Sequence, residues 1–80
     1  MWIRVETPTG ETLTEPVLGM SLFKHDGQQI TVTHRVCRDR ARLNHRGKVT
    51  VTYRYGFEPD VTREMELVDH TEEGLLIFNE

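Results

Sequence analysis

The chain has little that would point to a secreted, membrane-bound or disulfide-stabilised protein. It contains one cysteine, Cys37, so no disulfide can form within it, which is typical of a reducing compartment. No apolar run approaches the ~18 residues that a membrane-spanning helix needs. The N-terminal residues turn polar at Arg4, which is unlike a signal peptide. These absences predict a soluble, cytoplasmic protein.

The sequence also lacks the short motifs that mark common enzyme classes. It has no phosphate-binding glycine loop, no dinucleotide-binding glycine motif, no serine-hydrolase motif and no zinc-protease motif. His34 and Cys37 are three residues apart, so on a strand their side chains would point to opposite faces and could not share a metal. We therefore expect no catalytic residues, no metal site and no cofactor.

The charge is unevenly distributed along the 80 residues, although the net charge is only −3. Residues 24–54 hold eight basic and two acidic side chains, and the remainder holds two basic and eleven acidic ones. A chain of this length forms one domain with a thin core, so we expect residues 1–80 to be a single domain. The middle of that domain is basic and both ends are acidic.

Apolar and polar residues alternate over most of the chain, and turn signals separate the alternating runs. Period-2 alternation is typical of strands, because successive side chains point to opposite faces. This pattern predicts an all-β domain, namely a small antiparallel β-barrel or a two-sheet sandwich of about six to seven strands in a meander. The expected turns lie at Pro8–Gly10, Asp26-Gly27, Asn44–Gly47, Gly56–Asp60 and Thr71–Gly74.

The alternation changes parity in the basic part of the chain. Apolar positions are even-numbered from Ile30 to Val36 and odd-numbered at Ala41 and Leu43. A one-residue shift of this kind predicts a β-bulge or a strand break near residues 36–40.

The same alternation places several aromatic and polar residues. His34 shares the face of Val32 and Val36, so we expect it to be buried and neutral, with a lowered pKa. Trp2 has the opposite parity to its apolar neighbours, so we expect it outside the deep core, either in contact with a partner or over the end of the barrel. Tyr53, Tyr55 and Phe57 continue the core-facing parity and are expected to be core residues.

The basic segment is the main candidate binding surface. Arginine guanidinium groups match carboxylate and phosphate geometry, so a cluster of them suits an anionic partner. The alternative is that these side chains pair with acids of the same chain, such as Glu64, Glu66 and Asp69. The candidate binding residues are Arg35, Arg38, Arg40, Arg42, Arg46 and Lys48, with Trp2 as a further exposed contact.

These features predict a non-catalytic binding module that acts through a protein–protein surface. By analogy of size and class alone, such a module would be an inhibitor or accessory factor of the phage or mobile-element type. The alternatives are a small-barrel nucleic-acid-binding protein that uses the Arg-rich segment 35–48, and a self-assembling structural protein. A protein partner is expected first, with nucleic acid and a homo-oligomer left open and no membrane contact.

Overall fold

Seven strands and no helix make up the fold, which confirms the all-β prediction. The structure is a computed structural model that describes all 80 residues. It contains no helix long and apolar enough to cross a membrane. The strands are β1 (Trp2–Glu6), β2 (Thr12–Pro16), β3 (Leu22–Asp26), β4 (Gln29–Arg35), β5 (Gly47–Arg54), β6 (Val61–His70) and β7 (Leu75–Asn79).

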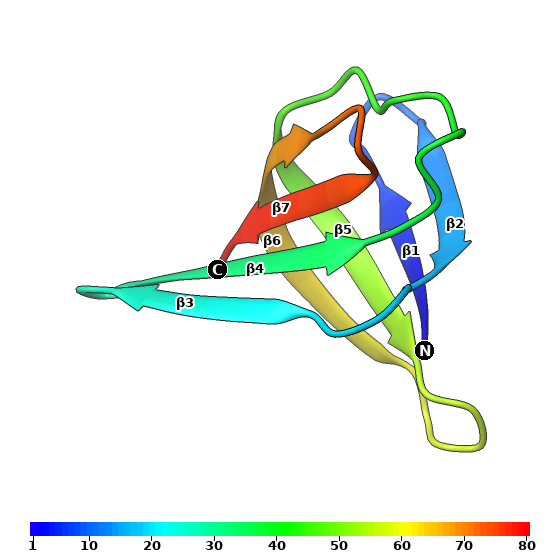
Figure 1. The fold of residues 1–80 in the computed structure, drawn as a ribbon, viewed down its shortest axis with the longest axis horizontal. Coiled ribbons are helices and arrows are strands. Elements are labelled where there is room, and N and C mark those ends of the chain that lie inside the picture. Colours follow the sequence, from blue (N-terminus) through cyan, green and yellow to red (C-terminus); the bar gives the residue numbers. More distant parts are fainter.

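All seven strands belong to one antiparallel sheet with the order β2-β1-β5-β6-β7-β4-β3 (Figure 1). The two-sheet sandwich is therefore wrong, and the sheet is not closed into a barrel, because β2 and β3 are unpaired edges. Only β5, β6 and β7 form a meander. The prediction of a meander through the whole chain is wrong, because β1 pairs with β5 and β4 pairs with β7.

Four of the five expected turns connect consecutive strands, as predicted. Asp26 pairs with Gln29 across a tight hairpin, and Gly27 in this turn has a φ of 64°, which glycine adopts at little cost. The hairpin expected at residues 44–47 is wrong. Residues 36–46 form no strand, and Gly47 begins β5. The strand break predicted near residues 36–40 is confirmed, since β4 ends at Arg35.

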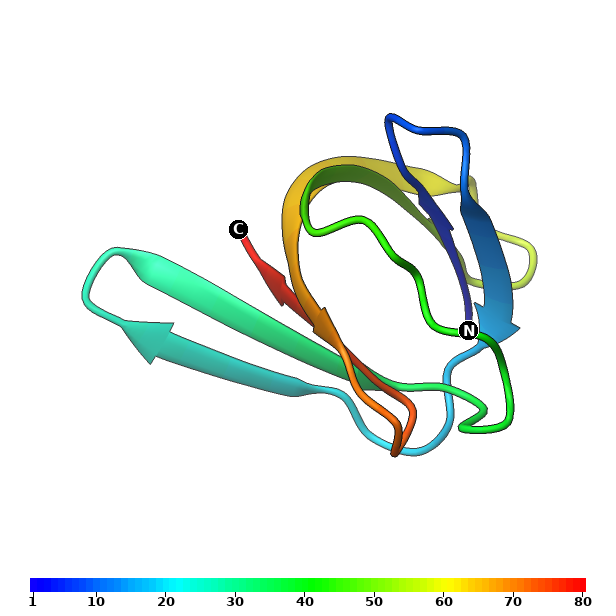
Figure 2. The same cartoon turned by 90° about the horizontal axis from the view of Figure 1, so that it is seen from above.

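The sheet curls so strongly that strands distant in its order face each other across the core (Figure 2). His34 on β4 contacts Tyr53 on β5, although β7 and β6 separate the two strands in the sheet. Eleven buried apolar residues fill the interior, and two of them, Val36 and Leu43, come from segment 36–46. This segment crosses one end of the curled sheet and covers the core there (Figure 2).

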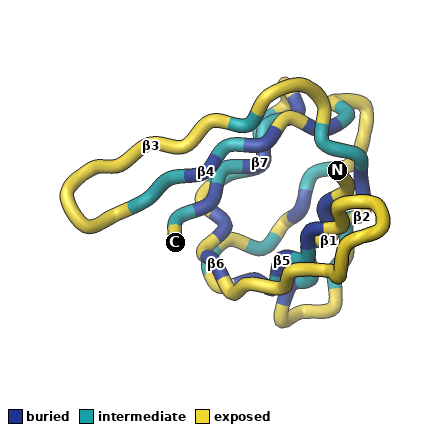
Figure 3. Tube along the Cα trace, turned by 90° about the horizontal axis from the view of Figure 1, so that it is seen from below, coloured by how far each residue is buried: buried dark blue, intermediate teal, exposed yellow.

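The β3–β4 hairpin extends away from the rest of the molecule, and we call residues 22–35 the arm (Figures 1 and 3). All five residues of β3 are exposed, including Leu22 and Phe23. On β4 the exposure falls toward the body of the protein, where Val32 and His34 are buried.

Candidate functional site

The two arginines nearest the end of segment 36–46 stabilise the segment itself. Arg42 donates hydrogen bonds to the backbone carbonyls of Arg38, Arg40 and Glu72. Arg46 donates to the carbonyls of its own segment and forms a 3.3 Å ion pair with Asp69. Because segment 36–46 forms no strand, its backbone carbonyls have no cross-strand hydrogen-bond partners. These two guanidinium groups supply the missing donors.

The remaining basic candidates differ in the partners they have within the protein. Arg40 pairs at 3.0 Å with Glu15, which is buried, and Lys48 pairs at 3.2 Å with Glu64. Arg35 makes one long contact, 3.4 Å, with the carbonyl of Glu73, and Arg38 is exposed with no ion pair. Pairing with acids of the same chain, the alternative expected from the sequence, thus accounts for three of the six basic candidates, namely Arg40, Arg46 and Lys48, while Arg42 binds backbone carbonyls instead.

Replacing Arg42 with methionine is expected to lower the free energy of unfolding by about 1–2 kcal/mol, because three carbonyls lose a charged donor. Arg38→Met is the control, since that side chain is exposed and unpaired, and it should change stability by less than about 0.5 kcal/mol. Urea denaturation measures both. Equal effects of the two variants would contradict this role of Arg42.

A groove of about 480 Å³ lies where the arm joins the body, between the arm and strands β5 and β6. Most of its wall is apolar, and much of that wall is exposed: Met20 is 89% exposed, Phe23 67% and Tyr55 48%. Arg63 and Glu80, which also line the groove, form a 3.0 Å ion pair with each other. We call this feature the arm groove.

A chain of three hydrogen-bonding side chains forms the floor of the arm groove. The hydroxyl oxygen of Ser21 lies 2.6 Å from Nδ1 of His34, and the hydroxyl oxygen of Tyr53 lies 2.7 Å from Nε2 of the same ring. A neutral imidazole donates through one nitrogen and accepts through the other, so the three groups satisfy one another. His34 is 2% exposed, which confirms its predicted burial.

Burial sets the protonation of these groups. It lowers the pKa of the His34 imidazole, as predicted, and raises the pKa of the Tyr53 phenol, because both charged forms lose water. The contact between Ser21 and His34 has the distance of a nucleophile and its base. The third member, however, is a neutral phenol rather than a carboxylate, so it supplies no negative charge to offset the imidazolium that general-base catalysis would form.

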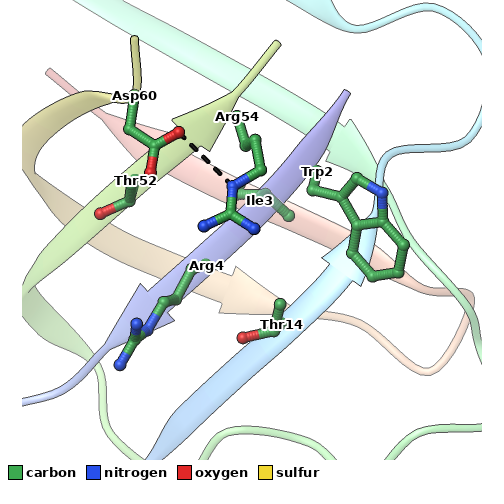
Figure 4. Close-up of a pocket in the computed structure, with 7 residues that line it drawn as sticks. All are labelled: Trp2, Ile3, Arg4, Thr14, Thr52, Arg54 and Asp60. Atoms are coloured by element: carbon green, nitrogen blue, oxygen red, sulfur yellow. Dashed lines mark ion pairs between the residues drawn. The ribbon is translucent and has the colours of Figure 1, made fainter. Parts of the chain in front are cut away.

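The outer face of the sheet carries a second hollow, of about 370 Å³ (Figure 4). Trp2 and Arg4 on β1 and Arg54 on β5 surround it, with the hydroxyl-bearing side chains Thr14 and Thr52 between them. Trp2 is 49% exposed, which confirms that it lies outside the deep core. We call this feature the outer-face hollow.

Sequence reasoning missed the arm groove for an identifiable reason. Tyr55 and Phe57 have core parity, but β5 ends at Arg54 and the turn after it leaves both rings exposed, so their prediction as core residues is wrong. The turn signal that begins at Gly56 could have shown this. The adjacent apolar residues Leu22 and Phe23 break the alternation, so the pattern assigns no buried face to β3.

The structure brings no three His, Cys, Asp or Glu side chains together in a way that could hold a metal ion. His34 hydrogen-bonds Ser21 and Tyr53, and His70 accepts a hydrogen bond at Nδ1 from the backbone N–H of Leu43. No family model, curated protein or solved structure matches this chain.

Proposed function

We propose that the chain is a non-catalytic protein-binding module that takes up an apolar, extended segment of a partner protein along the arm. The observation that carries this proposal is β3, an edge strand whose five residues are all exposed although Leu22 and Phe23 are large and apolar. An exposed, apolar edge strand tends to pair with another chain. Binding by addition of a strand would use this tendency.

The two edges of the sheet differ in how accessible they are. The β2 edge is partly protected: Arg40 of segment 36–46 pairs with Glu15, and the strand ends at Pro16, which has no N–H to offer. The Glu11 carboxylate, just before β2, accepts hydrogen bonds from the backbone of Asn44 and His45. By contrast, β3 pairs only with β4. A partner strand therefore fits at β3.

Charge in and around the arm groove favours a segment with little charge. Arg63 and Glu80 neutralise each other within the groove, and Lys24 and Asp26 on β3 carry opposite signs. An apolar side chain of the partner would be buried against Phe23 and Tyr55, where removal of apolar surface from water supplies the affinity. Such binding would depend little on salt.

Nucleic-acid binding through segment 35–48 has less support. Five of its six basic side chains already bind acids or carbonyls of the protein, Arg35 only through one long contact of 3.4 Å, which leaves Arg38 alone without an internal partner. A phosphate bound there would have to share most of these side chains with their internal partners. Arg38, which is exposed and unpaired, suits a protein interface as well as a phosphate, because arginine is enriched in protein interfaces.

Short synthetic peptides with apolar residues at alternate positions test this function, with fluorescence anisotropy as the measurement. Phe23→Ser is expected to weaken binding roughly tenfold, as loss of a central aromatic contact does. Phe57→Ser is the matched control, because that ring is fully exposed but does not line the arm groove. N-methylation of alternate peptide amides should abolish binding, because it removes the donors that a strand needs.

Two results would contradict the proposal. One is peptide binding that N-methylation leaves intact or that Phe23→Ser and Phe57→Ser weaken equally. The other is a dimer of this chain, seen by sedimentation equilibrium, that Phe23→Ser dissociates, because the occupant of β3 would then be a second copy. A protein that stays bound after nuclease treatment would not by itself show whether β3 pairs with a segment of another protein or with a second copy of this chain.

A further inference from the structure

We infer that the outer-face hollow binds a nucleotide, with the base on Trp2 and the phosphate between Arg4 and Arg54. This site lies on the face of the sheet opposite the core and shares no residue with the arm groove. The inference is therefore independent of the proposed function, and either one stands if the other fails.

The strand pairing brings the required side chains onto one face. Trp2 is opposite Arg54 across the β1–β5 pair, and Arg4 is opposite Thr52 in the same pair. On the other side of β1, Arg4 is opposite Thr14. Neighbouring side chains on one face lie about 5 Å apart across strands and about 7 Å apart along a strand. A ring and a phosphate separated by one sugar fit within that spacing.

Both guanidinium groups keep their terminal nitrogens available. Arg54 pairs through Nε with Asp60 at 3.5 Å, and Arg4 pairs through Nε with Glu6 at 3.3 Å. The carboxylates of Asp60 and Glu6 thus pair with Nε and leave the two terminal nitrogens of each guanidinium without an ion-pair partner. In Figure 4 the guanidinium of Arg54 lies over β1, between Trp2 and Arg4. Paired terminal N–H groups of this kind match the oxygens of a phosphate.

The indole of Trp2 offers an open apolar surface beside these charges. It is half-exposed, and the ring contacts of the chain involve His34, Tyr53, Tyr55 and Phe78 but not Trp2. Bases stack on such rings on open sheet faces. An anion without a ring would leave the indole unused, and an aromatic ligand without a phosphate would leave both arginines unused. A nucleotide satisfies both.

Two sources present this chemistry, a free nucleotide and a nucleotide within a single-stranded nucleic acid. Trp2 is the only tryptophan of the chain, so quenching of its fluorescence reports on the site directly. The protein (residues 1–80) is titrated with a nucleoside monophosphate, the matching nucleoside, inorganic phosphate and an oligothymidylate. Saturation by the monophosphate identifies a free nucleotide, whereas quenching by the oligonucleotide alone identifies a single strand, and either supports the inference.

The arginine contribution is tested with Arg4→Gln and Arg54→Gln, each expected to weaken binding roughly tenfold. Arg35→Gln is the matched control, since this exposed arginine lies on β4, outside the hollow. Three results would overturn the inference: no saturable quenching by millimolar monophosphate or by the oligonucleotide; a nucleoside that binds as well as its monophosphate; or a phosphotyrosine peptide that binds better than both nucleotide probes.

Discussion

Replacing Gly74 with alanine is expected to lower the free energy of unfolding by about 2–5 kcal/mol. Two costs combine at this position. The backbone has a φ of 87°, which residues other than glycine rarely adopt. An added Cβ would also approach the carbonyl oxygen of Val36 to 2.4 Å and the backbone of Arg38 to 3.1 Å.

The affected contact holds segment 36–46 against the turn between β6 and β7. The N–H of Val36 donates to the carbonyl of Gly74 at 2.7 Å, so the two backbones touch. Relieving the clash would shift the segment and expose Val36 and Leu43, which belong to the core. A domain of this size has a small stability margin, so a loss at the upper end of that range unfolds much of the protein.

Gly10→Ala is the matched control for this prediction. Gly10 has a similar φ of 91°, but nothing lies within 4 Å of the Cβ it would gain. It should therefore show the backbone cost alone, about 1–2 kcal/mol. Thermal and urea unfolding of the two variants measure the difference. Equal losses would mean that the close approach of the two backbones contributes nothing.

Mild acid is expected to destabilise the protein before its carboxylates titrate. His34 and His70 are both buried, and burial lowers the pKa of each imidazole in the folded state. The unfolded chain therefore binds more protons as the pH falls below about 6.5. The contribution of the two neutral histidines to the free energy of unfolding is fully present above that pH. It is lost progressively as the pH falls toward their pKa values in the folded state, at up to about 1.4 kcal/mol per pH unit for each histidine.

The two histidines lose stability for different reasons. Both hydroxyl partners of His34 can accept a hydrogen bond, so protonation of this imidazole breaks no hydrogen bond. Its cost is mainly that of burying a positive charge. His70 accepts the N–H of Leu43 at Nδ1, and a proton there would remove this bond. After burial, the positive charges of Arg42 and Arg46 lower the His70 pKa further, while Asp69 opposes them.

Urea denaturation between about pH 7.5 and 5 measures the combined effect, with a slope of up to about 2.7 kcal/mol per pH unit in the steepest part. His70→Asn should reduce the slope. An unfolding free energy that stays constant from pH 7.5 to 5 would show that neither buried histidine is coupled to folding.

Local features of the fold were predictable, because they depend on residues close together in the sequence. Alternating apolar residues indicated the strands, Asp26-Gly27 indicated the arm turn, and the parity change indicated the break after Val36. Strand order was not predictable in this way. The pairing of β1 with β5 joins residues about fifty positions apart, and nothing in the alternation of either strand selects its partner.

The same distinction applies to the candidate functional residues: those placed by local alternation were predictable, and those placed by contacts between distant segments were not. The exposure of Trp2 and the burial of His34 follow from parity and were predicted. The roles of Arg42 and Arg46 were not, because whether an arginine faces solvent or caps carbonyls depends on the course of a segment that has no regular structure. The arm groove as a whole was not predictable either, since it forms between residues from six different parts of the chain.

The strand order also determines when the chain can fold during its synthesis. The β1–β2 and β3–β4 hairpins emerge first, but each docks only on the β5–β6–β7 meander, which is made last. An isolated two-stranded hairpin is marginally stable in water. The apolar side chains of β1 therefore stay unprotected until β5 is made, and those of β4 until β7 is complete. Assembly then depends on contacts between distant parts of the sequence, which makes folding slow for a domain this small and exposes the nascent chain to aggregation.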